Sequence, residues 1–307
     1  RGSGDVYKRQ VIVGQEQTVD LVLTAILANG HVLIEGVPGV AKTLLARLTA
    51  RLIDADFSRV QFTPDLMPSD VLGTTVFNMK TNGFDFHQGP IFADIVLVDE
   101  INRAPAKTQA ALFEVMEERQ ISIDGTTHRM GDLYTILATQ NPVEQEGTYK
   151  LPEAQLDRFL MKITMDYPSL EEEVNILERH HTNAALVKLD DITPAITKEE
   201  LLSLRAFMNQ VFVDRTLLQY IALIVQQTRT SKAVYLGASP RASVAMLQSS
   251  KAYALLQGRD FVTPEDIKFV APYVLQHRLI LTAEAEMEGY SPVKVTQRLI
   301  DKVEVPK

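Results

Sequence analysis

The segment GVPGVAKT, residues 36–43, constrains the fold of this chain more than any other feature of its sequence. It follows a short apolar run at 31–35 that predicts a buried strand, and it precedes leucines at helical spacing. Loop N–H groups and the start of a helix together form a positive cradle for phosphates. We therefore expect a strand–loop–helix unit that binds a nucleotide through Gly36, Val37, Pro38, Gly39, Val40, Ala41, Lys42, Thr43 and Leu44.

Lys42 and Thr43 are the side chains of this loop that would act on the nucleotide. In loops of this pattern the lysine ammonium reaches the β- and γ-phosphates, and the following hydroxyl ligates Mg²⁺. Ala41 stands where such loops usually carry glycine, but its N–H remains available if its φ angle is negative. The alternative is a turn that merely starts a helix, and it leaves the acidic motif described next unexplained.

A second motif places two carboxylates at the end of an apolar run. Residues 95–98, Ile-Val-Leu-Val, predict a buried strand, and Asp99 and Glu100 follow directly. Ligands of open α/β sheets bind at the carboxyl ends of strands, and neighbouring strand side chains point to opposite faces. We therefore expect Asp99 to hold Mg²⁺ and Glu100 to act on an attacking water molecule as a general base. An ordinary acidic strand end is the alternative for this motif taken alone.

Strand and helix patterns alternate in the first half of the chain. Further strands are expected at residues 59–62, 133–138 and 160–165, and a helix at 106–119. This alternation is typical of a parallel sheet with helices on both faces. The expected fold class is therefore α/β, a P-loop NTPase parallel sheet flanked by helices. Asn82-Gly83 and Asp124-Gly125 each suit a type I′ turn and predict two protruding hairpins.

Beyond Pro168 only helical patterns are evident, which predicts a C-terminal all-helical domain. The boundary is expected near residue 185, between a core of residues 11–185 and a helical domain of 186–307. Residues 1–10 fit neither domain and are expected to be non-native or the edge of a fragment. The expected helices cover residues 170–181, 198–212, 215–230, 240–257, 264–275 and 293–303.

Composition excludes several functional classes. The 31 Lys and Arg against 39 Asp and Glu give a net charge of −8, which disfavours a general nucleic-acid binder. The chain has no cysteine, so a disulfide scaffold, a thiolate metal site and a cysteine nucleophile are ruled out. This fits a reducing compartment, and we expect a cytoplasmic protein. No apolar run reaches the roughly 18 residues of a membrane span.

Several longer stretches resemble one known family. Together with the phosphate loop and the Asp-Glu pair, they make the chain similar to the MoxR branch of the AAA+ ATPases, from Val11 to about Ala242. The resemblance implies an ATPase core followed by an AAA+ lid, with ATP and Mg²⁺ as cofactors. The matching stretches are VGQ, GHVLIEGVPGVAKT, QFTPDLMPSDVLGT, GPIFADIVLVDEINRAPAKTQAALFEVMEERQ, ATQNPVEQEGTYKLPEAQLDRF and GASPRA.

The resemblance also implies roles for residues outside the two motifs. Asn141 matches the polar sensor that orients water near the γ-phosphate, and Arg158 matches the arginine finger presented to a neighbouring subunit. The alternatives are a loop asparagine before proline and a surface arginine that pairs locally. The segment that wraps the adenine is matched by Val13, Gly14 and Gln15.

Arg241 matches the second sensor, in the lid, and its position adds a physical argument. Ser239 as N-cap and Pro240 as the first helical residue place Arg241 in the first turn of a helix. A cation there opposes the helix dipole by about 0.3–1 kcal/mol. We therefore expect an anion nearby, with the nucleotide γ-phosphate as the candidate, although a solvated arginine tolerated at slight cost is the alternative.

The resemblance implies a homo-oligomer, a hexameric ring that remodels or matures a protein client. Family members act with partners that carry von Willebrand factor A domains. The two hairpins match insertions at the central pore of such rings, and candidates for client contact are Phe77, Phe84 and Phe86. Two other functions stay open: the motor subunit of a metal chelatase, and a scaffold that assembles on ATP with little hydrolysis. A nucleic-acid motor is disfavoured by charge, and a small-molecule kinase or GTPase leaves the helical domain unexplained.

Overall fold

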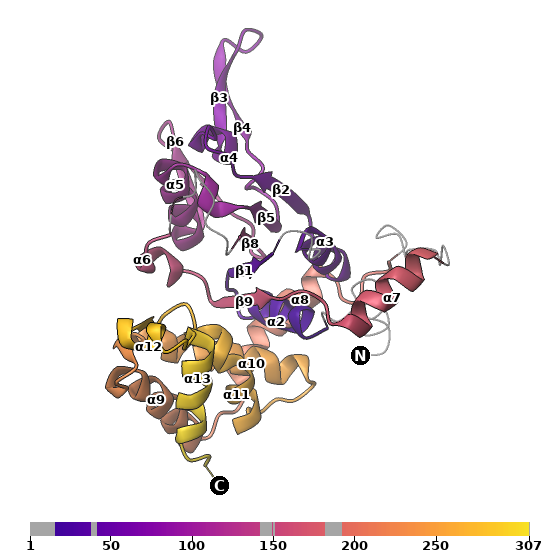
Figure 1. The fold of residues 1–307 in the computed structure, drawn as a ribbon. Helices are drawn as coiled ribbons and strands as arrows, with labels where there is room; N and C mark the ends of the chain where they lie inside the picture. Colours follow the sequence, from indigo (N-terminus) through magenta and orange to yellow (C-terminus); the bar gives the residue numbers. More distant parts are fainter. Residues whose placement is uncertain (1–15, 38–41, 142–148, 150, 182–191, 307) are drawn as a thin grey trace. The chain divides into compact units, whose positions relative to one another are not determined.

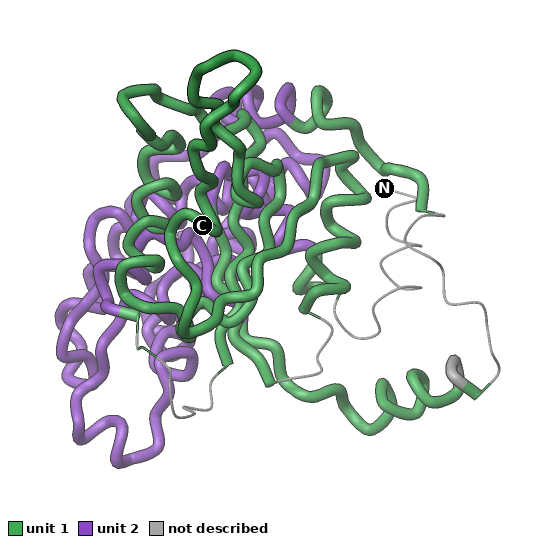
Figure 2. The backbone as a smooth tube through the Cα atoms, turned by 90° about the horizontal axis from the view of Figure 1, so that it is seen from above, with its two compact units in different colours: residues 1–19, 31–151, 164–201 green, residues 20–30, 152–163, 202–307 purple. Residues whose placement is uncertain are grey.

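The computed structural model describes residues 16–37, 42–141, 149, 151–181 and 192–306 (Figure 1). The chain divides into two compact units (Figure 2). Unit 1 comprises Arg1–Val19, His31–Leu151 and Thr164–Leu201, and unit 2 comprises Asp20–Gly30, Pro152–Ile163 and Leu202–Lys307. Both units are discontinuous in sequence, whereas the boundary expected near residue 185 divides the chain only once. That boundary stays a prediction, because 182–191 lie outside the described residues.

The α/β part is built on a five-stranded sheet with the order β2-β5-β8-β1-β9. β5 pairs in parallel with both β2 and β8, and β8 pairs in parallel with β1. Every residue of β5 is buried, as its continuous apolar run requires of a central parallel strand. The predicted fold class is confirmed. The strands are β1 (Val32–Gly36), β2 (Phe57–Gln61), β5 (Ile95–Asp99), β8 (Thr135–Gln140) and β9 (Met161–Met165).

Helices flank this sheet (Figure 1). In α5, apolar residues at helical spacing are buried, among them Leu112, Phe113 and Met116. A short 3₁₀ turn, η1 (Ile101–Arg103), follows β5. The helices of the first two thirds of the chain are α2 (Glu16–Leu27), α3 (Lys42–Leu52), α4 (Pro68–Leu72), α5 (Ala106–Glu118), α6 (Glu153–Leu156), α7 (Leu170–His181) and α8 (Lys198–Phe207).

Parallel pairing brings the carboxyl ends of three strands to one edge of the sheet. Val98 of β5 lies opposite Ala138 of β8, and Glu35 of β1 lies opposite Gln140 of β8. The residues that follow these strands therefore lie next to each other although they are far apart in sequence. This edge is where an open α/β sheet binds its ligand.

Both predicted hairpins form, and β3–β4 projects away from the sheet (Figure 1). β3 (Gly73–Asn78) pairs with β4 (Gly83–Gln88), and β6 (Gln120–Ile123) pairs with β7 (Thr126–Arg129). The second hairpin turns through Asp124 and Gly125, both with positive φ, as expected of a type I′ turn.

The first hairpin differs from the expected two-residue turn. Asn78 pairs with Gly83, so the loop spans residues 79–82 and Asn82 is its last residue. The Asn78 side chain accepts a hydrogen bond from the Lys80 N–H at 2.9 Å and donates one to Asp85 at 2.6 Å. These local bonds favour a longer turn, because the asparagine side chain replaces a backbone partner.

Unit 2 contains the helices of the C-terminal part. In α9 one face is buried, with Leu217, Ile221 and Ile224 at its centre. A two-stranded sheet of β10 (Val234–Leu236) and β11 (Ile280–Leu281) was not expected, because strands this short carry no readable periodicity. None of the helices in the described ranges is long and apolar enough to cross a membrane. The helices are α9 (Arg215–Thr230), α10 (Pro240–Leu256), α11 (Pro264–Leu275), α12 (Ala283–Met287) and α13 (Pro292–Lys302), with η3 (Met208–Gln210) after α8.

His31 connects three elements, β1, β8 and α5. It directly precedes β1, and its Nδ1 accepts the Ile136 N–H of β8 at 2.9 Å. The proton is therefore on Nε2, which donates to the Met116 carbonyl of α5 at 3.1 Å. Burial, together with repulsion from Arg119, lowers the pKa of His31 to about 3. The imidazole is neutral at physiological pH.

Acid should therefore destabilise the fold through His31. Its folded-state pKa of about 3 lies below the ordinary value of 6.5, so its stabilisation is complete above pH 6.5 and is lost as the pH falls toward 3. The His31 share of the loss is about 2 kcal/mol at pH 5. Urea unfolding at pH 7.5 and pH 5 should show a smaller loss in His31→Gln than in the parent chain. Equal losses in both proteins would show that His31 does not set the acid sensitivity.

Candidate functional site

The glycine-rich segment occupies the position expected from the sequence. β1 ends at Gly36, Val37 follows it, and α3 begins at Lys42. Thr43 and Leu44 continue the first turn of α3, which contains no acidic side chain. The predicted cradle residues Pro38, Gly39, Val40 and Ala41, and the predicted adenine segment Val13, Gly14 and Gln15, lie outside the described residues.

The Lys42 ammonium contacts the end of β1. Its Nζ donates to the Gly36 carbonyl at 2.5 Å, and the side chain is half-buried. Burial lowers the pKa of Lys42, and the carboxylates of Asp99, Glu100 and Glu35 act in the opposite direction. The Lys42 ammonium thus lies near three carboxylates, and two of them, Asp99 and Glu100, also pair with arginines.

Asp99 is the last residue of β5 and is nearly buried, with 6% of its surface exposed. Its Oδ1 accepts the Thr139 hydroxyl at 3.0 Å, and its Oδ2 accepts the Arg59 Nε at 2.6 Å. Two donors therefore fix the orientation of the carboxylate. A carboxylate is an oxygen ligand of the kind that Mg²⁺ takes.

Glu100 follows β5 but is not part of it. Its backbone is left-handed, with φ 55° and ψ 51°. A turn therefore sets the direction of its side chain relative to that of Asp99, whereas the sequence suggested that strand alternation would set it. Its N–H donates to the Thr139 hydroxyl at 3.0 Å. A non-glycine residue in this conformation is uncommon and costs about 1–3 kcal/mol. Such strain is typical of functional sites.

Two donors hold the Glu100 carboxylate. Its Oε2 accepts the Gln61 Nε2 at 2.8 Å and the Arg103 Nη1 at 3.0 Å. About a third of the Glu100 side chain is exposed. The carboxylate is therefore oriented by its neighbours but still open to water, which a general base requires.

The sequence did not single out Arg59, Gln61, Arg103 or Thr139. Arg59 and Gln61 are two residues apart on β2, so strand alternation places them on one side. That periodicity could have predicted that the two side chains share a face. It could not have predicted that they contact Asp99 and Glu100, because β2 lies beside β5 only in the folded sheet, where Gln61 pairs with Asp99.

The structure brings the remaining core residue to the same edge. Asn141 directly follows β8 and is half-buried, and it lies one residue beyond Gln140, the partner of Glu35. Thr43 is the second residue of α3. The Thr43 hydroxyl and the Asp99 carboxylate are oxygen ligands of the kind that Mg²⁺ takes together with phosphate oxygens and water. The residues present fit ATP with Mg²⁺.

Arg158 and Arg241 belong to unit 2. Arg158 follows α6 after Asp157, which is the C-cap residue. Arg241 is the second residue of α10, with Ser239 as N-cap and Pro240 first, as predicted. The Arg241 Nη1 lies 3.9 Å from the Asp157 Oδ2, so a protein carboxylate supplies an anion close to this arginine.

Comparison with known proteins identifies the family of this site and fold. The model of the ATPase family associated with various cellular activities (AAA) matches residues 31–161, and the AAA lid domain model matches 226–301. The chain is 48% identical over 305 residues to YeaC of Bacillus subtilis, covering 99% of this chain and 94% of that protein. It is 44% identical over 308 residues to the chaperone MoxR1 of Mycobacterium tuberculosis, covering 97% and 80% respectively.

A solved structure agrees with these relatives. The crystal structure of a candidate ATPase from Cytophaga hutchinsonii superposes with a TM-score of 0.89 at 41% identity, covering 99% of this chain and 94% of that one. The MoxR protein of Methylorubrum extorquens is 30% identical over 307 residues, covering 92% and 88%. The chain therefore belongs to the MoxR family of AAA+ ATPases.

Proposed function

We propose that this chain binds ATP with Mg²⁺, hydrolyses it as a subunit of a homo-oligomeric ring, and uses the energy to remodel a protein client. The observation that carries the proposal is the pair of oriented carboxylates, Asp99 and Glu100, beside the Lys42 ammonium at one sheet edge. A structural acidic strand end would not need donors from three separate elements to orient two carboxylates.

The proposal assigns one role to each residue of the site. Lys42 binds the β- and γ-phosphates, and Thr43 and Asp99 hold the metal ion. When bound, Mg²⁺ neutralises charge on the phosphate oxygens. Glu100 orients a water molecule and accepts its proton, while Asn141 donates a hydrogen bond from its carboxamide near the γ-phosphate.

Exposed aromatic side chains on the β3–β4 hairpin support a client contact. Phe84 is 73% exposed and stacks edge-to-face on Phe77, with their ring centres 5.3 Å apart. Phe86 contacts His128 of the second hairpin at 4.3 Å between ring centres, so the two hairpins meet. Phe77 and Phe84 therefore present an exposed apolar surface that suits an unfolded or partly folded protein segment, whereas Phe86 is half-buried against Phe92 and His128.

Replacing Lys42 with alanine should weaken the binding of a fluorescent ATP analogue about 100-fold. The loss of a charge-assisted phosphate contact costs about 3 kcal/mol, which corresponds to this factor. Arg47→Ala is the matched control, because Arg47 is an exposed cation on the same helix. The control should bind like the parent chain. Parent-like affinity in Lys42→Ala would remove the phosphate-loop assignment.

The client is best identified with a trapped variant. Glu100→Gln loaded with ATP and Mg²⁺ should hold the ring and its client together, because turnover is blocked while binding remains. A protein with a von Willebrand factor A domain in the pull-down supports the remodelling function. Recovery of a chelatase subunit, of nucleic acid, or of the ring alone favours one of the alternatives instead.

A further inference from the structure

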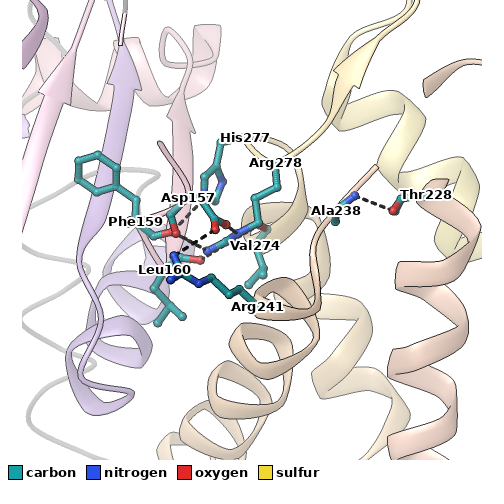
Figure 3. A network of polar contacts seen from close by, with 9 residues as sticks. All are labelled: Asp157, Phe159, Leu160, Thr228, Ala238, Arg241, Val274, His277 and Arg278. Atoms are coloured by element: carbon teal, nitrogen blue, oxygen red, sulfur yellow. Dashed lines mark hydrogen bonds and ion pairs between the residues drawn. The ribbon is translucent and has the colours of Figure 1, made fainter. Parts of the chain in front are cut away.

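A network of polar contacts inside unit 2 joins the end of α11 to the segment that carries Arg158 (Figure 3). Three consecutive residues, Gln276, His277 and Arg278, follow the last residue of α11. Each donates from its side chain to a backbone carbonyl of the segment 157–162. The contacts bridge more than 110 positions of the sequence, so no local preference produces them.

Arg278 makes most of these contacts. Its Nε donates to the Asp157 Oδ1 at 2.7 Å, its Nη2 to the Phe159 carbonyl at 2.8 Å, and its Nη1 to the Leu160 carbonyl at 3.1 Å. Its Nη2 also lies 3.3 Å from the Asp157 carbonyl, and its Nη1 donates to the Val274 carbonyl of α11. The planar guanidinium thereby fixes the backbone on both sides of Arg158.

His277 and Gln276 add two hydrogen bonds to the same segment. The buried His277 donates from Nε2 to the Phe159 carbonyl at 2.9 Å, and Gln276 donates from Nε2 to the Lys162 carbonyl at 2.5 Å. Phe159 itself is fully buried, and its N–H bonds the Leu156 carbonyl at 3.1 Å. Arg158 therefore lies between two residues whose backbones cannot move independently of α11.

The Asp157 carboxylate contacts two arginines unequally. Arg278 is bonded at 2.7 Å and only 5% of its side chain is exposed, whereas Arg241 lies at 3.9 Å and is 70% exposed. An exposed pair at this distance is weak. Arg278 therefore determines the position of Asp157, and Arg241 can leave the carboxylate without disturbing it.

Stability alone does not account for a buried guanidinium at this place. Burial lowers the pKa of Arg278, with Asp157 opposing that shift, so desolvation of the cation is costly. Apolar residues of similar volume often replace buried ion pairs without loss of stability. A planar fork differs from an apolar side chain because it defines the position and direction of several acceptors at once.

We propose that Asp157 and Arg278 are positioning residues that hold Arg158 at the angle required to reach the phosphates of a neighbouring subunit. This inference rests on the proposed function, in which Arg158 acts as the finger. The two residues would act on the rate through the position of Arg158, because a displacement of about 1 Å at a catalytic group can cost about 100-fold in rate.

Arg278→Lys tests the inference, with Arg259→Lys as the matched control. Lysine keeps the charge but loses the fork. Arg259 forms a two-pronged ion pair with Asp266 elsewhere in unit 2, and this pair does not contact the Arg158 segment. Arg278→Lys should lower kcat about 10-fold or more while the affinity for an ATP analogue stays within about twofold. Arg259→Lys should leave both quantities within about twofold at a comparable loss of thermal stability.

Two further measurements separate positioning from a general structural effect. Adding Arg278→Lys to Arg158→Ala should cost no further turnover, because the misplaced group is already absent. Protomers with Lys42→Ala but an intact Arg158 segment should restore turnover when mixed with Arg278→Lys protomers. Asp157→Asn, which preserves shape without charge, should repeat the kcat loss and serves if Arg278→Lys does not fold.

The outcomes distinguish this inference from its premise. A parent chain that does not hydrolyse ATP contradicts the proposed function itself, and normal turnover in Arg158→Ala contradicts the finger assignment and the inference with it. If Arg158→Ala is impaired, normal turnover in both Arg278→Lys and Asp157→Asn contradicts the positioning role alone. The positioning role is also contradicted if kcat of the Arg158→Ala, Arg278→Lys double variant falls by the product of the two single losses.

Discussion

Replacing Glu100 with glutamine should leave ATP bound and lower its hydrolysis about 10³-fold. Glutamine keeps the shape of the side chain but cannot accept a proton from water, and a general base contributes about 10²–10⁴ in rate. Lys42, Thr43 and Asp99 remain in place, so affinity should stay within about twofold. Single-turnover hydrolysis and equilibrium titration with the same nucleotide measure the two effects separately.

Glu118→Gln is the control for this experiment, because Glu118 is an exposed carboxylate at the end of α5. It should hydrolyse ATP like the parent chain. Turnover that survives in Glu100→Gln would mean that another group activates the water. A loss of affinity would instead mean that Glu100 contributes to binding, and the assignment of separate roles to Asp99 and Glu100 would then be wrong.

Replacing Arg158 with alanine should lower turnover about 10³-fold or more, without loss of folding. A guanidinium stabilises the charge that develops on the transferred phosphoryl group, and such fingers contribute about 10³–10⁵ in rate. Arg158 is half-buried, and its neighbour Phe159 is the residue whose side chain is packed in the core. The melting temperature should therefore change little while kcat falls.

Mixing the Arg158→Ala protein with Lys42→Ala protomers should restore turnover. The Lys42→Ala protomers cannot bind nucleotide but present an intact Arg158 to their neighbours, so each variant supplies what the other lacks. Neither variant should be active alone. Mixtures that stay inactive would place the finger elsewhere or restrict Arg158 to its own subunit, and the ring architecture would lose its support from this residue.

The two results also discriminate between the possible functions. A scaffold that assembles on ATP predicts that Glu100→Gln behaves like the parent chain, because hydrolysis is not required. A metal chelatase motor predicts the same kinetic effects as a chaperone but a different protein in the trapped complex. The proposed role of Glu100 as a general base uses the orientation that Gln61 and Arg103 give its carboxylate.

Local sequence patterns were sufficient for most of the fold. The apolar run at 95–98 and the helical spacing beyond Pro168 predicted elements whose ends the structure places within a few residues of the expected ones. The prediction succeeds because the apolar residues that bury a strand or a helix face are close together in the sequence. The cap of α11 is equally local, because Thr263 and Asp266, three positions apart, form a capping box at its start. The helices and strands that these patterns did not predict, among them α4, α6, α12, β10 and β11, are too short to leave a periodic signal.

The candidate site was predictable only in part, for the same reason. The sequence by itself predicted a phosphate loop, of which residues 38–41 lie outside the described residues, and it determined the acidic end of β5, since each motif lies within a few consecutive residues. Only the tertiary structure decided what holds those groups: Arg59 on Asp99, Gln61 on Glu100, and Arg278 on Asp157 are separated by about 40 to more than 120 positions. Such partners depend on the order of strands in the sheet and on the packing of α11, which are global properties of the fold and leave no local pattern.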